Sequence, residues 1–194
     1  MKNLKNTKTA QNLMKSFAGE CQARTRYDYY ASQAKKDGYI QISDIFSETA
    51  RNEKEHAKRF LKFLKENLNG EMIEITASYP VELGDTKSNL TAAAGGENEE
   101  FTDLYPGFAK IAQEEGFPEI ATAFTNIAKV EEKHELRFKK LLENIENDKV
   151  FKKDIKTLWK CGNCGYIHEG NEAPETCPAC VHPQSYFELF VENY

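Results

Sequence analysis

The sequence has no long apolar run and no excess of positive charge. None of its stretches approaches the roughly 20 apolar residues that span a bilayer, and its first twenty residues hold no run suited to a signal peptide. We therefore expect a soluble, cytoplasmic protein with no membrane partner. The formal net charge of −5 argues against a nucleic-acid partner, because phosphate binding needs a basic face. The Gly-x-Gly-x-x-Gly fingerprint is also missing, which argues against NAD binding by that route.

Cysteine is scarce until the C-terminal end of the chain. Cys21 stands alone, whereas Cys161, Cys164, Cys177 and Cys180 crowd into the last 34 residues. In a chain without an export signal, such clustering favours metal binding over disulfides. Each Cys-x-x-Cys pair forms one knuckle, and four thiolates make a closed tetrahedral site for zinc or iron. The spacing does not choose between these metals, so a zinc ribbon remains an alternative.

Residues from about 7 to 147 follow a helical period and divide into four helices. The breaks fall at Asp37-Gly38, at Asn69-Gly70 and between Gly116 and Pro118. The connection between the second and third helices is long, roughly residues 69 to 88. Two short links and one long crossover are the connectivity of ferritin-like bundles. Pro106-Gly107 falls inside the third helix, where we expect a kink.

The tail differs in kind from the helical region. The helical pattern ends after Asn147, and the aromatic residues of the tail could supply only a tiny core. A tail of 46 residues is small enough that its own core rarely holds it folded without a staple, so we expect a structural metal there. The sequence therefore predicts an all-α four-helix bundle over residues 1–148 and a small metal-stapled domain of strands and loops over residues 149–194.

An internal repeat relates the two halves of the helical region. A shift of 78 residues places the second helix on the fourth. The matched pairs are Phe46 with Phe124, Ala50 with Ala128, Glu53 with Glu131, His56 with His134, Arg59 with Arg137 and Phe60 with Phe138. Glu20 meets Glu97 at a shift of 77, whereas Tyr27 meets Tyr105 at 78. A duplicated helical hairpin with approximate two-fold symmetry explains this pattern.

The apolar seams of the four helices carry acidic residues and histidines at their centres. These are Glu20 on the first helix, Glu53 and His56 on the second, Glu97 and Glu100 on the third, and Glu131 and His134 on the fourth. Burying five carboxylates is costly, and no lysine or arginine on the seams compensates them. Two Glu-x-x-His pairs and a glutamate from each other helix form the ligand pattern of di-iron carboxylate bundles.

Weaker interpretations exist for single residues. One Glu-x-x-His pair alone is common on a solvated helix face, but its repetition on two seams favours metal. Glu55, Glu99, Glu132 and Glu135 lie off the seams, and we expect them in water. On the third helix we expect the seam to continue through Leu104, Phe108 and Ile111. Tyr27 and Tyr105 are either core aromatics or hydrogen-bond partners of the ligands.

Together these motifs resemble the rubrerythrin family over nearly the full chain. The segment from Trp159 through Cys161-Gly-Asn-Cys164-Gly-Tyr to Cys177-Pro-Ala-Cys180 is similar to the family's rubredoxin-like domain. Val181 stands where a glycine is usual, and the gap between the knuckles is shorter than in free-standing rubredoxins. The resemblance implies a ferritin-like di-iron domain followed by a rubredoxin-like domain with one iron in a four-cysteine site.

The resemblance also implies roles for individual residues. Two irons would be bound by Glu20, Glu53, Glu97, Glu131 and His134. Carboxylates would bridge the two irons, and an oxide would bridge them as well in the oxidised state. Glu100 and His56 would exchange at one iron as its redox state changes.

The function implied is a peroxidase that reduces hydrogen peroxide to water in oxidative-stress defence. The four-cysteine iron would relay electrons from an external donor, such as a rubredoxin or an NAD(P)H-dependent reductase. About 14 residues of helix, some 20 Å, separate the two centres within one chain, so we expect a head-to-tail homodimer. A ferroxidase or iron-storage protein is the second hypothesis. The third is a zinc-ribbon interaction module joined to a structural metal bundle.

Overall fold

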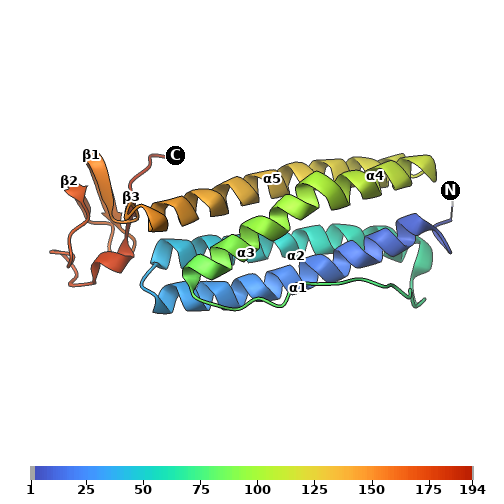
Figure 1. Cartoon of the computed structure of the whole chain (residues 1–194), viewed down its shortest axis with the longest axis horizontal. Helices are drawn as coiled ribbons and strands as arrows, with labels where there is room; N and C mark the ends of the chain where they lie inside the picture. Colours follow the sequence, from blue (N-terminus) through green and yellow to red (C-terminus); the bar gives the residue numbers. More distant parts are fainter. Residues whose placement is uncertain (1–2, 194) are drawn as a thin grey trace.

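The chain forms a bundle of long helices with a small sheet at one end (Figure 1). The computed structural model describes residues 3–193. The helices are α1 (Lys8–Lys36), α2 (Ile40–Leu68), α3 (Thr86–Glu99), the π-helical turn η1 (Glu100–Leu104), α4 (Tyr105–Glu114) and α5 (Pro118–Glu146). Since α3, η1 and α4 follow one another without a break, the predicted four-helix bundle with one long crossover is confirmed. Within the described residues, no helix is long and apolar enough to cross a membrane.

Local sequence signals set the helix ends. The Thr7 hydroxyl oxygen accepts the Ala10 N–H at the start of α1, which satisfies one of the unpaired donors of a helix N-terminus. Pro118 occupies the first turn of α5, where its missing N–H costs nothing. Gly38 and Gly116 follow the preceding helices with φ of 86° and 80°, a left-handed conformation that glycine adopts without steric cost.

The repeat seen in the sequence appears as two matching anchors. Asp37, after α1, accepts hydrogen bonds from the backbone N–H and the hydroxyl of Thr86 at the start of α3. Glu115, after α4, accepts the same two bonds from Thr9 at the start of α1. Each hairpin therefore fixes the N-terminus of the other, as the duplication predicts.

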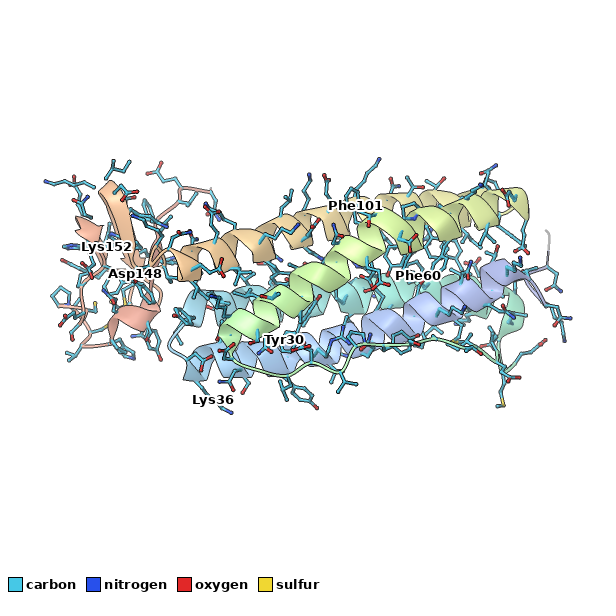
Figure 2. All side chains as sticks on the ribbon, in the orientation of Figure 1. Tyr30, Lys36, Phe60, Phe101, Asp148 and Lys152 are labelled. Carbon is cyan, nitrogen blue, oxygen red and sulfur yellow. The ribbon has the colours of Figure 1, made fainter. Side chains whose placement is uncertain are left out.

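Two aromatic clusters fill the bundle on either side of its middle. In one, Phe60, Tyr105 and Phe124 lie with ring centroids 5.0 to 5.8 Å apart. In the other, the ring centroids of Tyr27, Phe46 and Phe138 lie 5.1 to 5.9 Å from one another. Figure 2 labels Phe60 and Tyr30, which belong to opposite clusters. The polar groups at the middle of the bundle therefore lie between two apolar layers.

The π-helical turn changes the register of the third helix. The predicted seam residues Leu104, Phe108 and Ile111 are only partly buried, and their neighbours Tyr105, Ala109 and Ala112 take the core positions. The seam prediction was therefore wrong beyond Glu97. The Tyr105 N–H reaches back five residues to the Glu100 carbonyl, which inserts one residue and rotates everything after it. The irregularity thus precedes Pro106, where a kink was expected.

The tail forms a three-stranded antiparallel sheet in the order β2-β1-β3. Its elements are β1 (Lys152–Cys161), β2 (Ile167–Glu172), the 3-10 turn η2 (Gln184–Tyr186) and β3 (Phe187–Leu189). Trp159 and Phe187 are fully buried at the centre of a small cluster that includes two cysteines. The Phe151 ring stacks on Tyr39, between α1 and α2, at 6.2 Å. The tail therefore rests on one end of the bundle.

Candidate metal centres

Two histidines at the middle of the bundle each face three carboxylates. Around His56, the Nδ1 atom lies 2.9 Å from Glu53 Oε2, 3.0 Å from Glu131 Oε1 and 3.8 Å from Glu20 Oε2. Around His134, the Nδ1 atom lies 2.8 Å from Glu131 Oε2, 3.2 Å from Glu53 Oε1 and 3.7 Å from Glu97 Oε2. Helical i, i+3 spacing brings each Glu-x-x-His pair onto one face.

The two groups share the carboxylates of Glu53 and Glu131. Each of these side chains offers one oxygen to the His56 group and the other oxygen to the His134 group. Within each group, ligand atoms from all four residues lie within 4.8 Å of one another. Two adjacent metal ions would therefore each have one histidine, one glutamate of their own and two bridging carboxylates.

The donor atoms of this cluster fit a pair of cations. Among the described residues, five buried carboxylate oxygens have no donor near them other than the Nδ1 atoms of His56 and His134: Glu20 Oε2, Glu53 Oε1, Glu97 Oε2 and both oxygens of Glu131. Buried acceptors without donors are costly, and a bound cation removes that cost. Carboxylate and imidazole donors are suited to iron.

Electrostatics inside the cluster point the same way. Burial and the Glu53 charge raise the pKa of Glu97 to about 8. Burial also raises the pKa of Glu53, but hydrogen bonds from His134 and His56 outweigh it and hold that pKa at about 2. Burial lowers the pKa of His134, but the carboxylates of Glu131, Glu53 and Glu97 accept hydrogen bonds from its protonated ring and raise that pKa to about 12. Without metal, the site therefore retains protons in place of cations.

Two tyrosines connect the cluster to the opposite hairpin. The Tyr27 hydroxyl of α1 donates to Glu97 Oε1 of α3 at 2.5 Å, and the Tyr105 hydroxyl of α4 donates to Glu20 Oε1 of α1 at 2.5 Å. Burial and nearby glutamates raise the pKa of both phenols well above the usual value, so both stay protonated. Of the two roles the sequence allowed, both hold: the rings lie in the core and the hydroxyls bond to candidate ligands.

Glu100 is the candidate ligand that the structure places outside both groups. Its half-buried side chain starts in η1 and turns toward α1, where Oε1 would lie 3.9 Å from a β-carbon added to Gly19. Burial, followed by the charges of Glu20, Glu97 and Glu131, raises its pKa well above the usual value. Glu100 therefore interacts electrostatically with the cluster from outside it, and His56 is the residue that lies among the donor atoms.

One off-seam residue was placed wrongly from the sequence. Glu135 is buried, because Asn98 Nδ2 donates to its Oε1 at 2.9 Å and Lys139 also bonds to that atom. Glu55 and Glu99 are exposed as expected. The sequence carries no signal for the Asn98 contact, since it joins two different helices.

The four cysteines of the tail come together as predicted. The sulfurs of Cys161 and Cys180 lie 3.7 Å apart, as do those of Cys164 and Cys177. Thiolates at about 2.3 Å from a central ion in a tetrahedron are separated by about 3.8 Å. All four ligand atoms lie within 4.8 Å of one another, so the cluster fits one tetrahedral ion.

The two knuckles repeat the same backbone pattern. Gly165 N–H donates to the Cys161 carbonyl at 2.8 Å, and Val181 N–H donates to the Cys177 carbonyl at 2.9 Å. Gly165 and Val181 each come directly after a cysteine, and each has a positive φ, 80° at Gly165 and 61° at Val181. A β-branched residue is strained in this conformation. The left-handed turn is therefore retained at Val181 without the glycine that would suit it.

Comparison with known proteins identifies the combination. The family description Rubrerythrin matches residues 11–142, and the description "Rubrerythrin, rubredoxin-like domain" matches residues 159–188. The chain belongs to the rubrerythrin family. A rubrerythrin of Clostridium perfringens is 67% identical over the full length of both chains, and one of Nitratidesulfovibrio vulgaris is 53% identical, also over both full lengths.

Solved structures agree with this membership. A partially reduced nigerythrin superposes with a TM-score of 0.64 at 30% identity and covers 97% of this chain and 92% of its own. A Desulfovibrio desulfuricans bacterioferritin, at 23% identity and a TM-score of 0.66, shares the helical fold over 73% of this chain and 82% of its own. The rubrerythrin architecture, with donor sets for a di-iron pair and a rubredoxin-like iron, is thus the architecture of this chain.

Metal loading of this rubrerythrin site should release protons. Zinc added to the metal-free protein at pH 7 is expected to displace at least two protons per bundle, because Glu97 and His134 hold theirs at that pH and must lose them to bind metal. Calorimetry in buffers of different ionisation enthalpy counts all protons released, and the contribution of the four tail thiols is the same in wild type and in bundle variants. Glu97→Gln should lower the count by about one. An unchanged proton count in that variant would show that Glu97 is already ionised in the metal-free protein.

Relieving the strain at Val181 should stabilise the tail. Val181→Gly is expected to stabilise the metal-bound tail by about 1 kcal/mol, because a left-handed valine costs about 1–3 kcal/mol, of which part is offset by glycine's greater entropy when unfolded. The valine is 79% exposed, so little burial is lost. The denaturant midpoint for loss of the tail metal measures the gain. Val191→Gly, at an exposed position without positive φ, is the control and should show no gain.

Proposed function

We propose that this chain is an oxidoreductase of the peroxidase type, which reduces hydrogen peroxide to water in defence against oxidative stress. The observation that carries the proposal is the pair of donor sets sharing Glu53 and Glu131, joined in one chain to a four-cysteine site. Two ferrous ions held there would supply the two electrons that cleave the oxygen–oxygen bond. The tail iron would then return electrons from a rubredoxin or an NAD(P)H-dependent reductase.

The chain itself supplies protons and exclusion of bulk water. The Tyr105 and Tyr27 hydroxyls donate to Glu20 and Glu97, which holds one proton on each of these carboxylates beside the place where the peroxide would be reduced. The aromatic clusters on both sides close the bundle along its axis. These apolar layers lower the local dielectric and so strengthen the attraction between charged groups of the cluster.

Glu100 and His56 are proposed to exchange at one metal position. Four carboxylates would balance the charge of two divalent ions, so the neutral imidazole of His56 could serve as a further ligand without adding charge. Oxidation adds two positive charges in a region of low dielectric, which favours a fifth carboxylate. Glu100 lies beside the cluster on an inserted turn and is within electrostatic range of four of its glutamates.

A head-to-tail homodimer is proposed as the unit that transfers electrons. Within one chain, Glu131 precedes the last residue of α5 by 15 residues, which is about 22 Å of helix. The stacking of Phe151 on Tyr39 holds the tail beyond that end of the bundle. The tail of a second copy, placed beside the bundle's middle, would shorten the path.

Stopped-flow mixing separates peroxidase from ferroxidase activity. The fully reduced protein should be oxidised at least tenfold faster by hydrogen peroxide than by oxygen at equal concentration, because a bridging pair of ferrous ions matches a two-electron oxidant. Visible absorption of the ferric four-cysteine site reports the tail directly. Faster oxidation by oxygen would favour the iron-storage hypothesis, and a colourless tail with zinc bound would favour the interaction module.

The redox potential of the bundle site tests the exchange. Glu100→Gln keeps the size of the side chain and removes its charge, so the ferric state loses a compensating carboxylate. The midpoint potential should rise by about 60 mV or more, a tenfold change for a one-electron couple. Glu99→Gln, at the exposed neighbouring position, is the control. Equal potentials in both variants would contradict a role for Glu100 at the metal.

Mixed dimers test the head-to-tail arrangement. One variant carries Cys161→Ser and loses the tail iron; the other carries Glu53→Ala and loses the bundle pair. Neither homodimer should turn over. After subunit exchange, half of the dimers are mixed and each has one working bundle, so about a quarter of the wild-type rate should return. Transfer within single chains predicts no recovery, and circular dichroism checks that both variants fold.

A further inference from the structure

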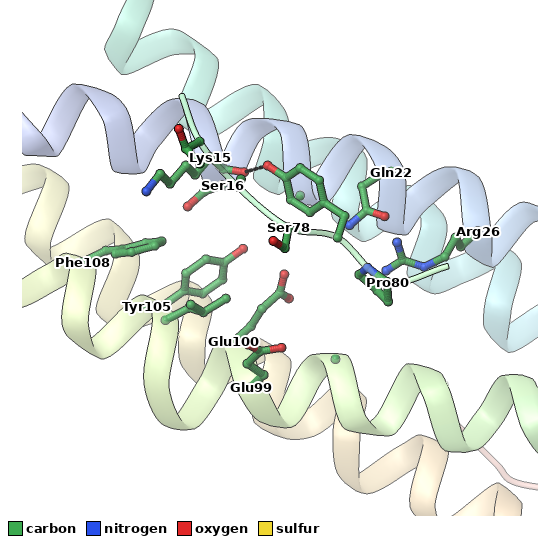
Figure 3. Close-up of a pocket in the computed structure, with 16 residues that line it drawn as sticks. Lys15, Ser16, Gln22, Arg26, Ser78, Pro80, Glu99, Glu100, Tyr105 and Phe108 are labelled. Carbon is green, nitrogen blue, oxygen red and sulfur yellow. Dashed lines mark hydrogen bonds between the residues drawn. The ribbon is translucent and has the colours of Figure 1, made fainter. Parts of the chain in front are cut away.

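A cavity of about 300 Å³ lies between α1, η1 and the crossover, directly beside the carboxylate cluster (Figure 3). Three of its lining residues connect it to the candidate metal position of Glu20 and His56. Gly19 precedes Glu20 in the chain, the Tyr105 hydroxyl bonds to Glu20, and Glu100 points into the space. The cavity therefore leads to one of the two metal positions.

The cavity is much larger than hydrogen peroxide. A water molecule occupies about 30 Å³ in the liquid, and a peroxide with two oxygens needs less than about twice that. A volume of about 300 Å³ is instead at the lower end for pockets that bind small organic ligands. Size alone therefore leaves room for an organic group attached to the peroxide.

Its two ends differ in chemistry. The side next to the cluster holds the Glu100 carboxyl and the Tyr105 hydroxyl, polar side chains of α1 such as Lys15 and Arg26 line another part, and apolar side chains from the crossover, η1 and α4 line the rest. These are Tyr79, Pro80, Leu104 and Phe108. Such a division suits a molecule with one polar, reactive end and a compact apolar body.

The crossover forms the outer wall and is attached to α1. The Tyr79 hydroxyl donates to the Lys15 carbonyl at 3.0 Å, and its ring passes 3.7 Å from where a β-carbon on Gly19 would lie. Glycine at this position leaves open the space between Tyr79 and Glu100. Ser78 faces Tyr105 and Glu100 from the same wall (Figure 3).

We propose that this cavity binds the organic group of small alkyl hydroperoxides, so that the enzyme reduces them as well as hydrogen peroxide. The inference rests on the proposed peroxidase function and extends its substrate class. The hydroperoxide oxygens lie at the Glu100 and Tyr105 end, and the alkyl group lies against Tyr79 and Phe108. The oxygen–oxygen bond breaks as it accepts two electrons, one from each ferrous ion, and two protons. The products are one alcohol and one water.

Steady-state kinetics with two peroxides test the substrate class. Wild-type protein should reduce tert-butyl hydroperoxide with kcat/KM within about a hundredfold of that for hydrogen peroxide. Ser78→Phe fills the cavity from its exposed wall, and the ratio of kcat/KM for tert-butyl hydroperoxide to that for hydrogen peroxide should fall at least tenfold. Val81→Phe, which adds the same ring at a fully exposed crossover position outside the cavity, is the control and should leave the ratio unchanged.

The failures of the two proposals are distinguishable. Reduction of hydrogen peroxide without tert-butyl hydroperoxide overturns this inference alone, and so does an equal ratio in both variants. Reduction of neither peroxide overturns the peroxidase function and this inference with it.

A binding measurement independent of turnover completes the test. Crystals of the oxidised, iron-loaded protein soaked in tert-butanol, the expected product, should show the alcohol between Tyr79 and Phe108. Ser78→Phe crystals treated identically should not. An empty wild-type cavity, or alcohol bound equally in the variant, would overturn the assignment.

Discussion

The bundle depends on the compensation of buried negative charge. Four glutamates and two histidines meet at its middle, and most of the glutamate oxygens there have no donor besides those two histidines among the described residues. A carboxylate in such a place is tolerated only when protonated or beside a cation. Burial and the charge of Glu53 raise the pKa of Glu97 to about 8, so this carboxyl keeps its proton at neutral pH when no cation is beside it. Cations at the centre let all four helices pack with their acidic residues inward.

Most of this centre could be predicted because a repeat carries its chemistry. The shift of 78 residues that matches His56 to His134 also matches Phe46 to Phe124. In the structure the two histidine rings face each other, and the two phenylalanines lie in the opposite apolar clusters. The register after Glu97 could not be obtained from helical periodicity, which places Leu104 in the core, where Tyr105 lies. A signal existed in the repeat itself. The shift is 77 at Glu97 and 78 at Tyr105, so one residue is inserted between them, where η1 lies.

What the sequence could not provide are contacts decided by side-chain direction. The burial of Glu135 depends on Asn98 reaching across from another helix. The position of Glu100 outside the cluster depends on how the π-helical turn directs its carboxyl. The tail was predictable to a greater extent, because four sulfurs with fixed knuckle geometry leave few arrangements. Even there, the left-handed conformation of Val181 contradicts the local preference of valine and is imposed by the knuckle.

The inserted residue makes two otherwise equivalent metal positions different. Duplication gives each position one histidine, one glutamate of its own and a tyrosine bonded to that glutamate. The insertion adds Glu100 to one hairpin only. In the other hairpin, the repeat-equivalent positions on α1 are Ala23 at a shift of 77 and Gln22 at a shift of 78, and neither is a carboxylate. The same turn lines the cavity that leads to Glu20. Because the extra carboxylate and the cavity lie on the same side, the metal position proposed to exchange its ligand is also the one to which the cavity leads.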